Sequence, residues 1–131
     1  MKVCKAGSTE PQQEFQTGDE IDIHVECINP SGEGTYHMGV LCSRNDDTQV
    51  WQTRSKEHDI AFKGEKSTLV VRVRLRLTAG EFFLAGYLLD ETCDHVMDQR
   101  LAWRRFKVTH QGIERGLVLV DARWLTPQEA K

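Results

Sequence analysis

The stretch Leu69-Val70-Val71-Arg72-Val73-Arg74-Leu75-Arg76-Leu77 alternates apolar residues with mostly charged ones. Its odd-numbered positions form an unbroken apolar row, and a period of two is typical of a β-strand with one face in the core and one in water. An amphipathic helix would instead place its apolar residues three or four positions apart. The segment 69–77 therefore predicts a half-buried strand, which assigns the chain to the β proteins.

Similar alternation extends outward from this strand in both directions. It predicts further strands at 20–28, 35–44, 50–53, 80–90, 100–109 and 117–124. Turn residues separate these runs, and the three prolines, Pro11, Pro30 and Pro127, all lie outside them, as a sheet requires. This pattern predicts an all-β, immunoglobulin-like antiparallel sandwich forming a single domain over residues 1–131, with 1–13 and 125–131 peripheral or poorly ordered.

Composition excludes several classes of function. The formal net charge of -3 and the pI near 5.9 argue against a nucleic-acid partner, which normally requires a basic surface. The longest apolar run, residues 82–89, is too short to cross a membrane. The first residues carry no apolar signal region, and the four cysteines lack the spacing of zinc or disulfide scaffolds. We therefore expect a cytoplasmic chain with reduced cysteines, of which Cys27 and Cys42 lie at inward positions.

No catalytic or metal-binding motif stands out. His24 and Cys27 could join Cys93 and His95 as metal ligands, but His24 and Cys27 point to opposite faces of their strand. No nucleophile lies on a recognisable elbow, and no pair of acids suggests general acid–base chemistry. The sequence therefore predicts a protein that is not an enzyme and that needs no cofactor or metal ion.

One exposed face of the sandwich is charged. If strands 20–28 and 68–77 pair, an acidic row comes to lie beside a basic row: Asp22, His24 and Glu26 beside Arg72, Arg74 and Arg76. The arginines could capture an anionic ligand, or the two rows could form ion pairs across the strands. Because the rows match, we favour the ion pairs.

The other exposed face is aromatic. With Phe82, Leu84 and Leu88 directed inward, Tyr87 points outward, toward a hollow left by the small residues Gly39 and Ala85. Aromatic rings bind the C–H faces of sugars, while arginine and histidine bind hydroxyls or acidic groups. The predicted ligand-binding residues are Tyr87, Trp103 and Arg105, with His37, Trp51 and Arg54 at the edges. The same surface could instead be a subunit interface, and both alternatives remain open.

The order of short motifs resembles a known family. Residues 14–21, Glu-Phe-Gln-Thr-Gly-Asp-Glu-Ile, are similar to the F-x-T-G-D/E-x-I/L opening of the C-terminal domain of Wzt, the ATPase subunit of O-antigen polysaccharide transporters. Met-Gly-Val at 38–40 followed by Gln-Val-Trp at 49–51 resembles that family's next pair of strands. Residues 77–82, 88–90 and 106–108 resemble its L-x-x-G-x-Y, A-L-x-D and F-x-V motifs.

This resemblance implies a cytoplasmic, non-catalytic carbohydrate-binding module with an immunoglobulin-like sandwich. Such domains recognise the modified non-reducing end of an O-antigen polysaccharide and so select it for export by an ABC transporter. The resemblance also implies a homodimer that exchanges a C-terminal strand, here residues 116–124, and contact with the membrane only through the transporter. It supplies no site residues, because those vary with the glycan.

Overall fold

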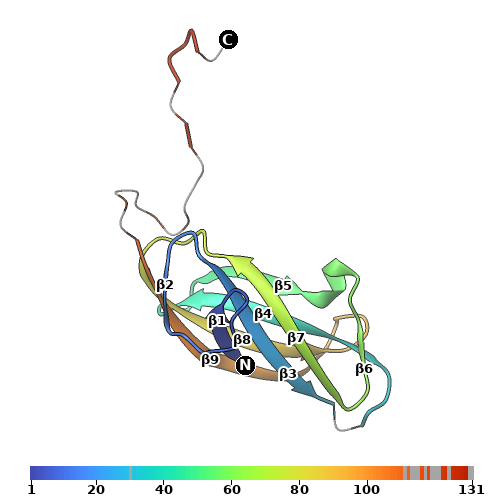
Figure 1. Ribbon diagram of the computed structural model, residues 1–131. Coiled ribbons are helices and arrows are strands. Elements are labelled where there is room, and N and C mark those ends of the chain that lie inside the picture. Colours follow the sequence, from blue (N-terminus) through green and yellow to red (C-terminus); the bar gives the residue numbers. More distant parts are fainter. Residues whose placement is uncertain are drawn as a thin grey trace.

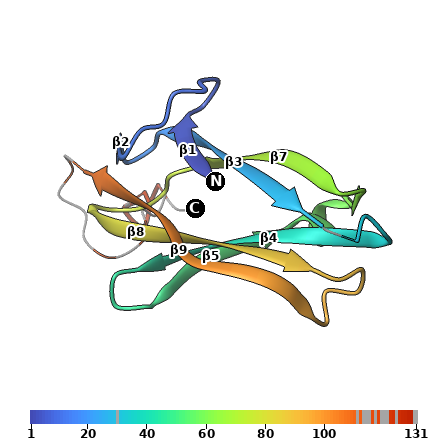
Figure 2. The ribbon, with the colours of Figure 1, turned by 90° about the horizontal axis from the view of Figure 1, so that it is seen from below.

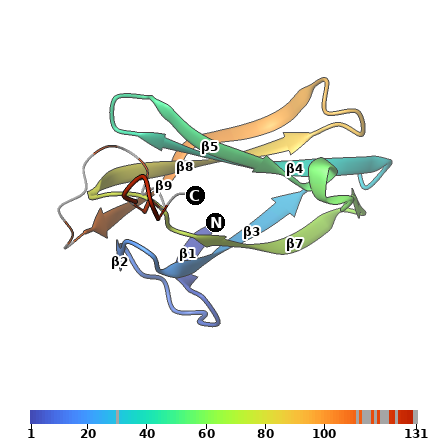
Figure 3. The ribbon, with the colours of Figure 1, turned by 90° about the horizontal axis from the view of Figure 1, so that it is seen from above.

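The computed structural model describes residues 1–29, 31–110, 112, 116, 118, 122–123 and 125–129. Two β-sheets pack face to face in this part of the chain, so the predicted all-β sandwich is confirmed (Figures 1, 2 and 3). The elements in chain order are β1 (Lys2–Lys5), β2 (Glu14–Gln16), β3 (Glu20–Ile28), β4 (Thr35–Arg44), β5 (Gln49–Arg54), the short 3-10 helix η1 (Ser55–His58), β6 (Phe62–Lys63), β7 (Lys66–Arg74), β8 (Gly80–Leu89) and β9 (Val96–Thr109).

Strands β3 and β7 are neighbours in one sheet, so the pairing of segments 20–28 and 68–77 considered above is confirmed. The smaller sheet has the order β1-β3-β7, and the larger has the order β2-β9-β8-β4-β5, with β6 also pairing with β4. One pairing departs from the predicted antiparallel arrangement, because β2 runs parallel to β9. No hairpin turn joins these two strands, so no short connection forces β2 to run antiparallel.

The N-terminal segment is more than the peripheral extension that the sequence suggests. Strand β1 pairs with β3 from Lys2 to Lys5, and both Val3 and Cys4 are buried. Their burial adds apolar surface to the core of the smaller sheet, which otherwise has only two strands. The expectation that all of residues 1–13 are peripheral is therefore wrong for β1.

The core lies between the inner faces of the two sheets. At one end, the ring of Phe106 stacks on Phe82 at a centroid distance of 5.6 Å and meets Phe15 edge-on at 6.1 Å. Cys42 is fully buried and Cys27 packs beside the core, as predicted from their strand positions. Burial raises the pKa of the Cys42 thiol to about 12, so this thiol behaves as a small apolar side chain. All four cysteines are free thiols.

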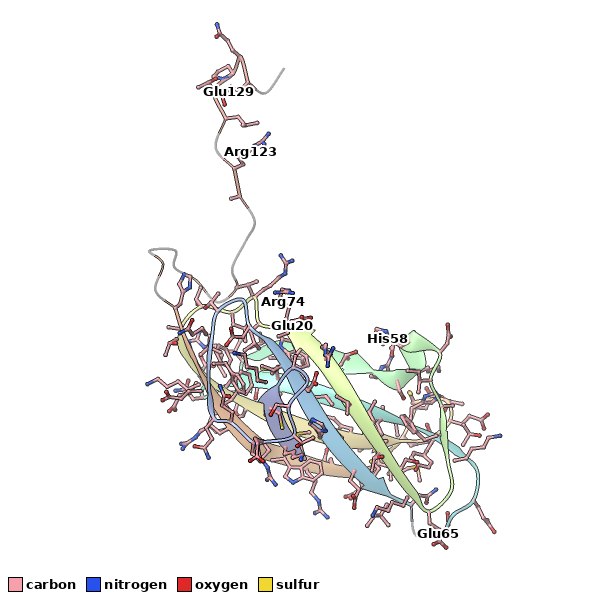
Figure 4. The ribbon with its side chains drawn as sticks, in the orientation of Figure 1. Glu20, His58, Glu65, Arg74, Arg123 and Glu129 are labelled. Atoms are coloured by element: carbon pink, nitrogen blue, oxygen red, sulfur yellow. The ribbon has the colours of Figure 1, made fainter. Side chains whose placement is uncertain are left out.

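The charged rows of the smaller sheet form ion pairs, as the matched charges suggested. Arg72 donates two hydrogen bonds to the carboxylate of Asp22, at 2.7 and 2.9 Å. The backbone N–H of Gly7 donates a third, at 2.8 Å. Arg74 lies 3.4 Å from Glu20 (Figure 4). Glu26 lies 3.5 Å from Lys66, so Glu20, Asp22 and Glu26 all have basic partners within the protein, which favours the ion-pair alternative for this face.

Asp22 should make stability depend on pH in the acid range. Its hydrogen bonds from Arg72 and Gly7 lower the pKa of the carboxyl from 3.8 to about 2. A depressed pKa stabilises the folded state above the unfolded-state pKa, and this contribution disappears as the pH falls through about 2. Asp22→Asn should therefore be less stable than wild type at pH 7, with the difference shrinking between about pH 4 and 2.

Thermal unfolding followed by circular dichroism across this pH range checks the prediction. Glu20→Gln is the matched control, because Glu20 pairs with Arg74 at the exposed surface of the same sheet. A stability difference between Asp22→Asn and wild type that stays constant down to about pH 2 would contradict the assignment.

The predicted exchanged strand, residues 116–124, lies mostly outside the described residues. Among those described, Val118 forms an antiparallel bridge with Leu77, and the carbonyl oxygen of Gly116 accepts a hydrogen bond from the Thr78 hydroxyl. Farther along, Arg123 and Glu129 lie clear of the sandwich (Figure 4). These positions show where the chain leaves the body of the domain.

Candidate functional site

The outer face of the larger sheet carries the candidate site. Phe82, Leu84 and Leu88 of β8 lie in the core, so the predicted parity of this strand is confirmed, and Tyr87 faces outward and is half-buried. Directly across the ladder from Tyr87 is Gly39 of β4. Gly39 is in turn paired with Arg54 of β5, so one row across the sheet joins Tyr87, Gly39 and Arg54.

This row forms the floor and walls of a depression of about 220 Å³, which we call the outer-face hollow. Its walls come from β4, β5, β8 and the turn that leads from β8 into β9. The lining residues used below are Gly39, Gln52, Arg54, Tyr87, Leu89 and Cys93. The hollow therefore combines an aromatic ring, an aliphatic side chain, a thiol and two groups that donate hydrogen bonds.

Gly39 leaves the floor of the hollow open. A Cβ atom at this position would lie 3.5 Å from Cγ of Arg54, 3.6 Å from Cδ1 of Leu89 and 3.7 Å from the carbonyl oxygen of Thr53. These are ordinary van der Waals distances. A methyl group at this position would therefore fit without a clash.

The charge of Arg54 is compensated within the site. Its Nε donates a 2.7 Å hydrogen bond to Oε1 of Glu57, and its Nη2 donates to the same oxygen. The hydrogen bond from Arg54 lowers the pKa of Glu57, and that of Arg54 is raised in turn. The pair holds the guanidinium over the hollow, where its other N–H groups can meet sugar hydroxyls or ether oxygens.

The turn at residues 90–95 shapes the rim. The side chain of Asp90 accepts hydrogen bonds from the backbone N–H groups of Asp94 at 3.0 Å and His95 at 3.3 Å. Between them, Cys93 adopts a left-handed conformation with φ of 62°. This turn brings Cys93 and Val96 to the hollow. No alternation pattern covers the turn, so sequence reasoning missed both residues.

His37 is covered by protein, so the predicted exposure of this residue at the edge of the site is wrong. It projects on the same side as Leu89, but the segment after β5 folds over it, and only 8% of the residue remains exposed. Its Nδ1 lies 2.9 Å from the carbonyl oxygen of Ile60 and 3.1 Å from Oγ of Ser55. Because a carbonyl oxygen only accepts, Nδ1 carries the proton, and His37 ties this segment to β4.

Trp51 also lies elsewhere than predicted. It pairs with Cys42, whose side chain is in the core, so the Trp51 ring faces inward and packs against the core. A register shift in the β4–β5 ladder follows immediately, between Cys42 and Ser43. Such a bulge changes which residues oppose one another, and strand alternation alone does not reveal it.

Trp103 is displaced to the inner side of the sheet by a second irregularity. Leu84 pairs with Arg104 and Gly86 with Arg100, so a single β8 residue, Ala85, stands opposite residues 101–103 of β9. Within this bulge Ala102 has a φ of 47°. The Trp103 ring then lies over Gly86, so close that a Cβ there would be 2.9 Å from Cζ3 of Trp103. The prediction that Trp103 shares the outer face with Tyr87 is wrong.

Arg105 is exposed and pairs with Phe83, which faces outward. Arg105 therefore lies on the predicted face, but on the neighbouring strand β9. Its partner Phe83 is four residues before Tyr87 on β8, so Arg105 lies outside the hollow. Of the six predicted site residues, the structure brings only Tyr87 and Arg54 together.

Within the described part of the chain, no three His, Cys, Asp or Glu side chains are close enough to share a metal ion. Nor does that part contain a helix long and apolar enough to cross a bilayer.

Comparisons with known proteins give a fold but no sequence relative. The sequence matches no protein-family model and no curated protein. The crystal structure of the C-terminal domain of wzt superposes with a TM-score of 0.78 at 15% identity, covering 95% of this chain and 79% of that one. A β-glucuronidase from Bacteroides uniformis superposes with a TM-score of 0.55 at 16% identity, covering 76% of this chain but 12% of the enzyme. The chain therefore has the fold of the C-terminal domain of wzt.

Proposed function

We propose that this chain is a non-catalytic carbohydrate-binding domain that holds the end of a polysaccharide in the outer-face hollow. The observation that carries the proposal is the row of Tyr87, Gly39 and Arg54, which combines a half-buried ring, a residue without a side chain and a guanidinium held by Glu57. An aromatic ring next to planar hydrogen-bonding groups suits a sugar, which has both C–H faces and hydroxyls. The fold likeness to the C-terminal domain of wzt supports the same function.

The ligand would be the modified non-reducing end of an O-antigen polysaccharide. In this proposal the domain acts at the cytoplasmic face of the inner membrane and selects the finished glycan for export by an ABC transporter. Support comes from the five motifs that resemble the Wzt family and from the fold. The shallow hollow implies modest affinity. In an open, hydrated site, the free energy gained from contacts exceeds the entropic cost of ordering the glycan by only a small amount.

Filling the hollow tests the proposal. Gly39→Ala adds a methyl group whose contacts of 3.5 to 3.7 Å the fold accommodates. The added group occupies the floor that the sugar would use, so we expect binding to weaken by about tenfold or more while the melting temperature changes little. Isothermal titration with the best-bound member of an array of bacterial polysaccharide fragments measures this effect.

Gly80→Ala is the matched control. Its new methyl group would also meet neighbours at 3.5 Å, the ring atoms of Phe82, but it lies outside the hollow. Unchanged binding by Gly39→Ala would exclude the hollow as the binding site. The competing function, in which the outer face is a subunit interface, would instead appear as a change in sedimentation for Gly39→Ala, with no glycan bound by wild type.

The proposal includes a homodimer in which residues 116–124 are exchanged between subunits. Deleting residues 116–131 should then give an aggregating or unstable chain, because an unpaired edge and an apolar surface would be exposed. Size-exclusion chromatography with light scattering measures the outcome, and a well-behaved monomer would argue against strand exchange.

A further inference from the structure

Trp103 marks a second surface, at the open edge of the sandwich. In the described part of the chain, β1 covers only residues 21–24 of β3, and β2 pairs only with residues 107–109 of β9. The stretch 25–28 of β3 and the first half of β9 therefore face each other with no strand between them (Figure 2). Sandwich edges are commonly closed by such strands, and here the edge is open.

A groove of about 380 Å³ follows this open edge, and we call it the edge groove. Its lining includes Cys27, Ile28, Asp98, Gln99, Arg100 and Trp103. Trp103 is half-buried, with one edge of its ring packed on Gly86. Because Gly86 has no side chain, the ring is held close to the sheet and forms part of the groove wall.

The polar groups beside the ring suit a sugar. Nη2 of Arg100 lies 3.9 Å from Oδ2 of Asp98, and these two residues pair with Gly86 and Leu88, which face inward from β8. The side chains of Arg100 and Asp98 are both more than half exposed, so they remain available to hydroxyl groups. A tryptophan ring in a groove that also contains a carboxylate and a guanidinium offers an apolar platform with hydrogen-bonding partners nearby.

The edge groove and the outer-face hollow share one lining residue. Tyr87 lines both, and Gln99, which lines the groove, is its direct partner across the β8–β9 ladder. Because β9 is the strand next to β8, Tyr87 lies only about one strand spacing, roughly 5 Å, from the free edge of β9. A glycan whose end lies in the hollow would enter the groove by crossing this edge near Gln99.

We propose that the edge groove is a second sugar-binding subsite, which takes internal units of the same polysaccharide. This inference rests on the function proposed above for the hollow. A strand from another protein is a poorer occupant, because the bulge at residues 101–103 and the left-handed Ala102 interrupt the β9 edge that such a strand would pair with.

The test separates the two subsites by glycan length. The probes are the best-bound hexasaccharide from the array of bacterial polysaccharide fragments and its non-reducing-end disaccharide. Wild type should bind the hexasaccharide about tenfold more tightly than the disaccharide, an increment typical of one added platform. Arg100→Ala and Trp103→Phe should lose this difference while their Kd for the disaccharide stays unchanged. Lys107→Ala, at an exposed position of β9 outside the groove, is the control.

The outcomes are distinct. Retention of the length dependence by both Arg100→Ala and Trp103→Phe would overturn the second subsite while leaving the hollow intact. Equal binding of the two glycans by wild type would do the same. A change in oligomeric state for these variants, with unaltered glycan binding, would identify the edge as a protein interface. If wild type bound neither glycan, the proposed function itself would fail.

Discussion

Replacing Phe106 by alanine is expected to lower the free energy of unfolding by about 3–5 kcal/mol, the usual cost of removing a buried phenylalanine. Phe106 is 1% exposed, and its ring contacts the rings of Phe15 and Phe82. These three residues come from β2, β9 and β8, so the cavity would loosen the part of the larger sheet where β2 joins it. Urea unfolding of the wild type and the variant measures the effect.

Phe83→Ala is the control for Phe106→Ala. Phe83 belongs to the same strand pair but faces outward and is only half-buried, so its loss should cost much less. Similar destabilisation by the two variants would mean that burial of the Phe106 ring in the aromatic cluster contributes little to stability beyond that of a half-buried ring. A loss below about 1 kcal/mol for Phe106→Ala would lead to the same conclusion.

Tyr87→Ala is expected to weaken binding of the terminal disaccharide by roughly 10- to 100-fold, since truncating an aromatic anchor costs on the order of 2 kcal/mol or more. The ring is half-buried on the outer face, between the hollow and the free edge. Its removal takes away the platform of the hollow and leaves the inward-facing residues of β8 in place. Isothermal titration at fixed salt concentration gives the change in Kd.

Phe83→Ala serves as the control for Tyr87 as well, because Phe83 projects from the same face of the same strand but does not line the hollow. Equal affinity of wild type and Tyr87→Ala for the disaccharide would remove the proposed sugar platform. Comparing Tyr87→Ala with Gly39→Ala adds a consistency check, since both act on one hollow from opposite sides.

Strand alternation predicted the fold and part of the site. Period two in residues 69–77 and 82–90 indicates which side chains enter the core, because neighbouring residues of a strand project to opposite faces. Tyr87 and Gly39 were placed on the outer face in this way, and Arg54 at its edge. The charged rows of β3 and β7 could be matched because Asp22 and Arg72 occupy corresponding positions in regular strands.

The remaining site residues depended on features that alternation does not contain. The bulge in β9 turned Trp103 inward, and the register of β5 with β4 did the same for Trp51. His37 has outward parity, but a segment about twenty residues later in the chain covers it. Bulges, and segments that pack over an outward residue, depend on contacts between parts of the chain that are far apart in sequence. The local alternation of residue types therefore does not predict them.

For this protein the sequence by itself determined the main strands and their inward and outward faces, because both follow from the two-residue period of an extended backbone. Only the tertiary structure decided which outward residues meet. It gathered Tyr87, Gly39 and Arg54 into one hollow and moved Trp103 to the open edge. The reason is that strand register, bulges and the packing of one segment over another depend on contacts between different strands. The sequence of any one strand does not specify these contacts.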